Sequence, residues 1–473
     1  MKKICLLAAG IIFSLAAKAQ VSESYPLWLS QYGLNGTANY VSRAGAMGAV
    51  GGDFTAASYN PAGLGLYRMS EITFSAGLNF AFTNSTFNGL KTNDDRTNFN
   101  VGNLGAVMNF DVNGSAMKNF QFGFGFNKLK DYSNRTSINR EGVTNSYISS
   151  IFDIIMNAND LYNDYVTSGV ISVDTISDSI YNLYDSDFLT GVFNQYKKIE
   201  TSGYLSEMTF SFSTNINDVV YLGATIGVPL FDHKRSEYFT EECTSDPAVG
   251  YYNGTTISEL SGAGANFKLG AIVKPVEWLR LGAAIHTPTY YSVSDYYYSS
   301  VEYNYKSGGD APDLFYDIQS PFRFIGSLAL VLGDNTTKVA GTLSADYEYA
   351  NYANMKYRFN DDARYENEIN NKINNKFQAA HSLRLGGELK IGVLALRAGY
   401  AVLGNPYAGE AGNDASQQYI TGGIGYRAKS FFFDLGYAYT LTNNNTKYYF
   451  YDGTAAMLSH NEHLVQATIG FRF

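Results

Sequence analysis

Cysteine is nearly absent from this chain, which has 2 cysteines among 473 residues. Cys5 lies in the amino-terminal stretch MKKICLLAAGIIFSLAAKAQ, where two lysines precede an apolar run and an Ala17-Lys18-Ala19 sequence. This arrangement is typical of a secretory signal peptide, so we expect residues 1–19 to be removed and the mature protein to begin at Gln20. Cys243 is then alone, which excludes an intramolecular disulfide and a metal or redox site built on cysteines.

Long apolar runs, proline and positive charge are also scarce. After the signal peptide no apolar stretch reaches the roughly 18 residues that a membrane-spanning helix needs. Proline occurs 9 times, and no linker or low-complexity segment marks a domain boundary. The formal net charge of -9 argues against a nucleic-acid partner or an anionic membrane surface. If the chain lies in a membrane, it does not cross that membrane as helices.

Glycine, tyrosine and phenylalanine are abundant instead, with 46, 39 and 31 residues spread along the whole chain. In the last stretch, HLVQATIGFRF, every second residue from Val465 to Phe473 is apolar. Such alternation over about ten residues is typical of transmembrane β-barrel strands. It recurs near 71–83, 99–111, 119–132, 203–215, 219–231, 260–273, 277–289, 321–332, 338–350, 380–390, 393–403, 418–428, 430–442 and 463–473. We therefore predict an all-β fold, a transmembrane antiparallel β-barrel of about fourteen strands over residues 71–473.

The connections between these segments alternate in length. Short turns such as NINDV, KPVE and KIG join every second pair of strands, and much longer links lie between them, the longest over 133–202. Short periplasmic turns and long extracellular loops are expected of outer-membrane barrels, so the cell outer membrane of a Gram-negative bacterium is the predicted location. A soluble all-β protein is the competing interpretation, but it would need polar residues where this chain has Phe, Leu and Tyr.

Residues 20–70 precede the first strand and show no strand alternation. They are rich in glycine and alanine and nearly uncharged. A barrel of about fourteen strands leaves a lumen that wall side chains alone do not fill. We therefore expect this segment to form a hatch that plugs the lumen.

The stretch RAGAMGAVGGDFTAASYNPAGLG, from Arg43 to Gly65, resembles the amino-terminal hatch of the FadL-like (FadL/TodX) outer-membrane transporters, with Asn60-Pro61-Ala62 matching their NPA motif. The later stretches LRLGAAIHTPTYY and SLRLGGELKIGVLALRAGYAVLGNPY are similar to strand-and-turn sequences of the same family. The resemblance implies passive uptake of long-chain fatty acids and other hydrophobic compounds through a hatch-gated lumen. Asn60, Pro61, Ala62 and Gly63 become the gating candidates.

The resemblance also implies that ligand leaves sideways into the bilayer through a wall gap at a kinked strand. Gly123 and Gly125, in the third strand, are candidates for this opening because interior glycines weaken or bulge a strand. The more ordinary explanation is that strand glycines make room for the plug. Both explanations stay open at this stage.

Ligand-binding candidates come from the long loop and from inward charges. Ile148, Ile151, Phe152 and Ile155 recur at helical spacing and predict an amphipathic helix that either receives apolar ligands or packs on the barrel rim. Most inward-facing charges are expected to form ion pairs with the hatch or the wall. Arg384 and Arg397 are candidates to bind a ligand carboxylate instead, since a guanidinium group matches that geometry.

Nothing in the sequence predicts an enzyme, a cofactor or a metal site. The five histidines form no recognisable nucleophile motif or metal-spaced pair. The expected partners are a hydrophobic small molecule, outer-membrane lipid and, through the strand that ends at Phe473, the barrel-assembly machinery. We expect a monomer that binds no nucleic acid. An alternative function is a plugged barrel whose extracellular loops act in surface binding or adhesion, and a general porin is disfavoured by the hatch.

Overall fold

The computed structural model describes residues 21–112, 116–146, 191–245, 251–303, 305–310, 312–333, 339–360, 362–409, 414–442, 446–450 and 452–473. The predicted signal peptide and the predicted loop helix with Ile148, Ile151, Phe152 and Ile155 lie outside these described residues.

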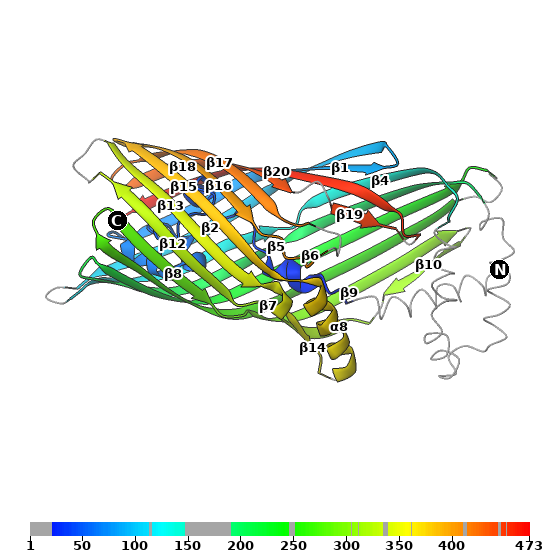
Figure 1. Cartoon of the computed structure of the whole chain (residues 1–473), viewed down its shortest axis with the longest axis horizontal. Helices are drawn as coiled ribbons and strands as arrows, with labels where there is room; N and C mark the ends of the chain where they lie inside the picture. The colour runs from blue at the N-terminus through cyan, green and yellow to red at the C-terminus, as the bar shows by residue number, and fades with distance from the viewer. Residues whose placement is uncertain are drawn as a thin grey trace.

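The strands form one closed antiparallel sheet (Figure 1). They are β1 (Glu71–Phe87), β2 (Leu90–Asp111), β3 (Met117–Asp131), β4 (Asn134–Val143), β5 (Phe193–Ile216), β6 (Val220–Cys243), β7 (Tyr251–Val276), β8 (Leu279–His286), β9 (Tyr290–Tyr303), β10 (Tyr305–Asp310), β11 (Leu314–Gln319), β12 (Arg323–Leu332), β13 (Val339–Asn351), β14 (Lys356–Arg358), β15 (Ala379–Ile391), β16 (Leu394–Leu403), β17 (Gln417–Arg427), β18 (Phe431–Thr442), β19 (Thr446–Tyr449) and β20 (Ala455–Arg472). In the part of the chain that the structure describes, they make a barrel with 14 wall strands, because β4 continues β3, β9 continues β8 and β11 runs into β12. Glu71 of β1 lies opposite both Val107 of β2 and Arg472 of β20, so the wall closes. The predicted barrel is confirmed.

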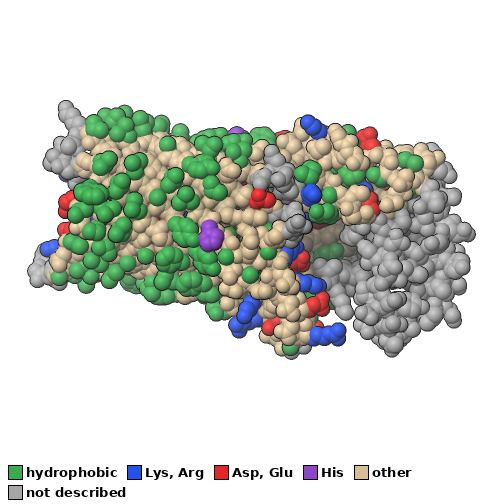
Figure 2. All heavy atoms as spheres, in the orientation of Figure 1, with side chains coloured by type: hydrophobic (Ala, Val, Ile, Leu, Met, Phe, Trp, Pro, Cys, Tyr) green, Lys and Arg blue, Asp and Glu red, His purple; other side chains and the backbone are tan. Residues whose placement is uncertain are grey.

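The outer face of the wall is apolar, as the alternation predicts. In β20, Val465, Ile469 and Phe471 are exposed, whereas Gln466 and Thr468 between them are buried. Figure 2 shows hydrophobic side chains spread over the part of the barrel that holds the C-terminus in Figure 1, while charged side chains gather toward α8 (Ala363–Lys376). An apolar belt of this kind is what lipid requires of a barrel wall in the outer membrane.

The two ends of the barrel differ. At one end, tight turns join neighbouring strands, and Asn217, Asp218 and Gly392 adopt the positive φ angles that such turns need. The same end holds Ser70 and Phe473, whose backbones exchange two hydrogen bonds of 3.1 and 3.0 Å. We call it the short-turn end and the opposite one the long-loop end.

At the long-loop end, links that the sequence predicts as loops are largely sheet. The β1–β2 hairpin stays paired up to Phe87 and Leu90, and β5 and β6 stay paired up to Phe193 and Cys243. The links also contribute β4, β9, β10, β11, β14, β19 and the helix α8. These extensions lie beyond the apolar belt, so their outward residues need not be apolar. The alternation of apolar and polar residues is therefore lost there, although the backbone hydrogen bonds of the sheet continue.

The segment before β1 lies inside the barrel, as predicted for a hatch. It contains α2 (Tyr25–Ser30), α3 (Ala38–Ser42), α4 (Ala56–Tyr59) and the 3-10 helix η1 (Pro61–Leu66), and most of its side chains are buried. No helix among the described residues is long and apolar enough to cross a membrane.

Candidate functional site

The body of the hatch, from Thr37 to Leu66, folds around one carboxylate. Asp53 accepts hydrogen bonds from the Thr37 hydroxyl at 2.7 and 2.8 Å, from Asn39 Nδ2 at 2.9 Å and from the Thr55 backbone N–H at 3.0 Å. Thr37 also caps the first turn of α3, since its side chain accepts from the Tyr40 N–H. The hatch body is thus stabilised by its own polar contacts, in addition to its contacts with the barrel wall.

The Asn60-Pro61-Ala62 corner connects α4 to η1. Asn60 Nδ2 donates to the Gly48 carbonyl at 2.6 Å, and Asn60 Oδ1 accepts from the Ala62 N–H at 3.2 Å. Pro61 begins η1 at a position where its missing N–H costs nothing. The asparagine side chain therefore stabilises the corner with two hydrogen bonds, one to the earlier hatch residue Gly48 and one within the turn.

Glycines of the barrel wall lie directly against this corner. A Cβ atom on Gly223 of β6 would meet the Pro61 backbone, and one on Gly270 of β7 would meet Asn60 Oδ1, both well under the 3.0 Å that real Cβ atoms keep. Gly63 faces the hatch itself, because a Cβ there would lie 2.9 Å from Ala56 Cβ. The corner therefore packs against wall positions where only glycine leaves enough space.

Ion pairs fix the hatch body to the opposite wall. Arg43 of the hatch pairs with Glu388 at 2.6 Å, and Arg397 pairs with Glu388 and Asp434 at 2.7 and 2.8 Å. Arg384 pairs with Glu348 at 2.8 Å and donates to the Tyr59 hydroxyl at 2.6 Å. The two arginines that the sequence nominates as ligand partners are therefore bonded to carboxylates of the wall, and a ligand carboxylate would have to compete with those ion pairs.

Gly123 and Gly125 also face the hatch. A Cβ on Gly123 would lie 2.9 Å from Leu64 Cδ1, and one on Gly125 would lie 2.8 Å from Phe54 Cζ. The ladder of β3 is continuous at both glycines, and its irregularities lie toward the two ends of the strand, between Met117 and Asn119 and between Lys128 and Lys130. Gly123 thus makes room for a hatch side chain, whereas a Cβ on Gly125 would meet the Leu104 and Gly105 backbone of β2 before it met Phe54.

The wall ladder is open next to that irregularity. Pairing between β2 and β3 ends at Asn103 and Asn127, and in the described part of the chain the rest of β2 pairs only with β1, while β4 pairs only with β5. β4 turns inward, and Thr83 and Ser85 on the inner face of β1 donate hydrogen bonds to Asn134 Oδ1 and the Ser137 carbonyl at 2.9 and 2.5 Å. Among the described residues, β2 and β4 share no backbone ladder, and their hydrogen bonds each use at least one side chain, as in Asn139 Nδ2 to Thr92 Oγ1 at 3.1 Å and the Ser137 N–H to Asp94 Oδ2 at 2.5 Å.

A surface groove of about 590 Å³ accompanies the open ladder. It is lined by Asp95, Arg96, Thr97, Arg135, Glu200, Ser202, Lys234, Ser236 and Tyr238. Its residues come from β2, β4, β5 and β6, so the groove lies where β4 has left the line of the wall. The open ladder and this groove together form the wall gap.

A group of ion pairs lies beyond the apolar belt on β5 and β6. Glu237, on the long-loop part of β6, lies 2.6 Å from both Lys197 and Arg235. Burial by itself would raise the pKa of Glu237, but the two cations outweigh burial and hold that pKa at about 2. The carboxylate stays ionised at any pH near neutral.

The first hatch segment, α2, is held differently from the hatch body. Tyr25, Leu27 and Leu29 are buried in an apolar cluster with wall residues that include Phe231, Tyr291, Tyr316 and Tyr357, and α8 contributes Ile369 and Ile373. Its backbone carbonyls accept hydrogen bonds from wall tyrosines, as in Tyr132 to Trp28 at 2.9 Å and Tyr291 to Leu29 at 3.1 Å. A short apolar peptide thus fills an aromatic volume inside the long-loop part of the barrel.

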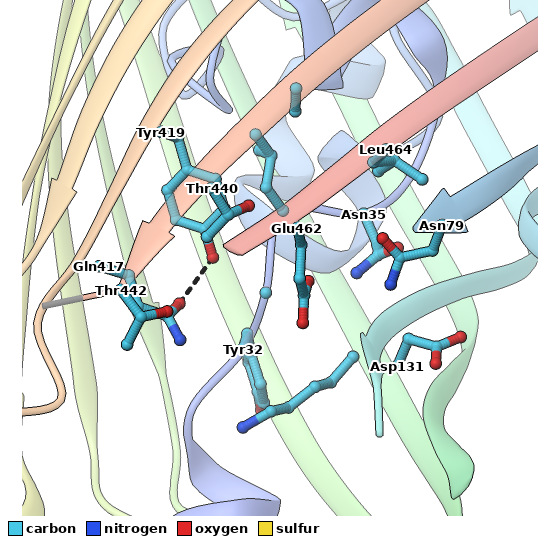
Figure 3. Close-up of a pocket in the computed structure, with 14 residues that line it drawn as sticks. Tyr32, Asn35, Asn79, Asp131, Gln417, Tyr419, Thr440, Thr442, Glu462 and Leu464 are labelled. Carbon is cyan, nitrogen blue, oxygen red and sulfur yellow. Dashed lines mark hydrogen bonds between the residues drawn. The ribbon is translucent and has the colours of Figure 1, made fainter. Parts of the chain in front are cut away.

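A polar pocket of about 60 Å³ lies between the hatch and the wall (Figure 3). Figure 3 shows Asn35 and Tyr32 of the hatch facing Thr440, Thr442 and Glu462 of the wall across an open centre. The remaining lining residues are Gly33, Leu34, Asn79, Lys130, Asp131, Gln417, Tyr419, Ala438 and Leu464. Sequence reasoning missed this pocket and α2, although the lysine-rich run NKLKD at the end of the third strand was a visible signal.

Comparison with known proteins gives matches in structure only. No family model matches the chain, and no curated protein sequence matches it. The fold is similar to a FadL homologue from Pseudomonas aeruginosa (TM-score 0.56, 12% identity, 94% of this chain and 100% of that one) and to the CymD monoaromatic hydrocarbon channel (TM-score 0.54, 11% identity, 94% and 99%). It is also similar to the Pseudomonas putida toluene transporter TodX (TM-score 0.53, 13% identity, 93% and 99%). The resemblance to FadL-like transporters is thereby confirmed at the level of the fold.

Proposed function

We propose that this protein is an outer-membrane channel for the passive uptake of small hydrophobic molecules such as long-chain fatty acids. The observation that carries the proposal is the two-part hatch: an anchored body lies across the lumen, and an apolar peptide, α2, occupies an aromatic volume of the kind that an apolar ligand would fill. The similarity in fold to channels named for hydrocarbons and toluene supports the same substrate class.

The route that we propose begins at the long-loop end, on the cell exterior. Apolar ligand displaces α2 and enters the aromatic volume lined by Tyr291, Tyr316 and Tyr357. It leaves sideways where the wall gap begins, next to Asn103 and Asn127 and near the outward-facing, exposed Phe99 of β2, rather than through the hatch body. The sideways step is supported by the missing ladder between β2 and β4, which lies beyond the positions of Gly123 and Gly125.

Uptake in cells tests the proposal. The full-length chain is expressed in a Gram-negative strain that lacks its own channel for hydrophobic compounds, and entry of a radiolabelled long-chain fatty acid is compared with entry in cells that carry the empty vector. We expect faster entry, because the outer leaflet of such cells is a barrier to apolar solutes. Entry at the rate of the empty-vector cells, with the barrel shown to be assembled by its heat-dependent mobility on gels, would contradict the proposal and leave surface binding as the better candidate.

A further inference from the structure

The surface groove of the wall gap is bordered by cations from four strands. Arg96 of β2, Arg135 of β4 and Lys234 of β6 line it. Lys198 of β5 lies beside it, opposite Tyr238 in the β5–β6 pairing. The side chains of Arg135 and Lys234 are 40% and 47% exposed. A ligand at the outer surface of the barrel can therefore contact them.

One carboxylate is shared by two of these cations. Glu200 Oε1 lies 2.8 Å from Arg135 Nε and 3.2 Å from Lys198 Nζ. Among the residues that line the groove, three are cationic and two, Asp95 and Glu200, are anionic. The lining therefore carries an excess of positive charge, although the formal net charge of the whole chain is -9.

Arg96 reaches across the open ladder from β2. Its Nη1 donates to the backbone carbonyls of Asn134 in β4 and Thr201 in β5 at 3.3 and 2.8 Å. These acceptors are neutral, so they hold the guanidinium group at the groove without cancelling its charge. On the opposite side of the groove, Lys234 pairs with Glu259 of β7. An anion in the groove thus has a fixed cation on each side.

The groove begins where the outer face of the wall changes from apolar to polar. On β2 the exposed Phe99 is followed, toward the long-loop end, by Thr97 of the groove, and on β5 the exposed Tyr204 is followed by Ser202. Lipid head groups lie at this boundary between hydrocarbon and water, and tyrosine side chains are common there. Since the long-loop end faces the cell exterior in the proposed orientation, the head groups are those of the outer leaflet.

We propose that the groove binds the head group of a phosphorylated outer-leaflet glycolipid, with Arg135 and Lys234 in direct contact with the phosphate. A guanidinium group matches the geometry of phosphate oxygens, and the hydroxyls of Thr97, Ser202 and Ser236 suit the sugar. A groove of about 590 Å³ has room for a sugar phosphate. The bound lipid covers the outer side of the open ladder, whatever compound the channel carries.

Binding of two lipids that differ only in phosphate tests this inference. Radiolabelled lipid A and dephosphorylated lipid A are titrated into the full-length protein in detergent, with EDTA present so that divalent ions cannot bridge the contact. We expect the double variant Arg135→Gln, Lys234→Gln to bind lipid A about tenfold or more weakly, the range of hydrogen bonds to a charged group, and to bind the dephosphorylated lipid like the wild type. Lys91→Gln is the matched control, because Lys91 is exposed on the β1–β2 hairpin outside the groove.

A second variant reverses the sign of the effect. Asp95→Asn removes one of the two carboxylates of the lining, so lipid A should bind more tightly while binding of the dephosphorylated lipid stays the same.

Inorganic phosphate as a competitor distinguishes a lipid site from a site for free phosphate. We expect it to displace lipid A only in large excess, because it lacks the acyl chains that lie against the apolar belt. Displacement at equimolar amounts, equal binding of both lipids by the wild type, or unchanged lipid A binding in the double variant would each overturn the inference. None of these measurements depends on uptake, so this failure and a failure of the proposed function are distinguishable.

Discussion

At the scale of single residues, glycines decide where the hatch rests. Gly223 and Gly270 sit on neighbouring strands, and the atoms that a side chain would meet there belong to Pro61 and Asn60. The Asn60-Pro61-Ala62 corner is thus defined as much by the wall as by its own turn. This contact favours a corner that stays in place while other parts of the hatch move.

A wedge at the corner tests this assignment. Gly270→Val places a side chain where Asn60 Oδ1 now lies, and such overpacking costs about 1–3 kcal/mol of folding free energy. We expect a lower urea midpoint for the refolded protein in detergent. Gly341→Val is the control, because the nearest atom to a Cβ there is 3.8 Å away. Equal midpoints for the two variants would show that the corner is loosely seated.

Sequence reasoning identified many of these residues but not their partners. The inward positions of Arg384 and Arg397 follow from the period of two, since each alternates with lipid-facing leucines. The carboxylates that bind them lie on other strands, and only the barrel register brings Glu348 and Asp434 into reach. Lys130 was missed because the irregularity between Lys128 and Lys130 breaks the alternation on which the prediction depends.

At the scale of elements, the hatch divides into a body and a leading segment. The body, from Thr37 to Leu66, is bonded internally through Asp53 and to the wall through Arg43 and Gly48, whose N–H donates to Asp346 at 2.8 Å. α2 is attached mainly by apolar contact and by hydroxyl bonds to its carbonyls, and at its end the Arg323 guanidinium donates to the Ser30 carbonyl. Apolar contact is what an apolar ligand replaces most readily, so α2 is the element that we expect to move.

Loosening α2 tests which element gates uptake. The double variant Leu27→Ala, Leu29→Ala removes two buried side chains, each typically worth about 2–5 kcal/mol in a packed core. We expect faster entry of a labelled fatty acid with an intact barrel on gels. Ile369→Ala on α8 truncates the same apolar cluster from outside the hatch and should leave entry unchanged. If both variants raise entry alike, the cluster as a whole, and not α2, limits the flux.

At the scale of the whole molecule, contact with lipid explains which parts of the fold could be predicted from the sequence. Within the apolar belt every outward residue must suit hydrocarbon, and all fourteen predicted segments overlap a wall strand of the structure. Beyond the belt that constraint ends, so the extensions at the long-loop end and the inward turn of β4 left no periodic trace. The open ladder follows from that inward turn and was therefore not predictable at its observed place.

The same inward turn defines where ligand leaves the barrel in the proposed route. Thr92 of β2 and Asn139 of β4 face each other across the open ladder, with their side chains in hydrogen-bond contact. In a Cys243→Ser background, Thr92→Cys with Asn139→Cys allows a short bifunctional thiol reagent to tie the two strands together. We expect the cross-link to slow entry of a labelled fatty acid several-fold, because exit requires β2 and β4 to separate.

The control pair is Thr86→Cys with Lys91→Cys, which joins two strands that are already hydrogen-bonded to each other. Slowing by the first cross-link alone locates the exit at the wall gap, whereas unchanged entry in both cross-linked proteins would place the exit elsewhere and return attention to a path through the hatch.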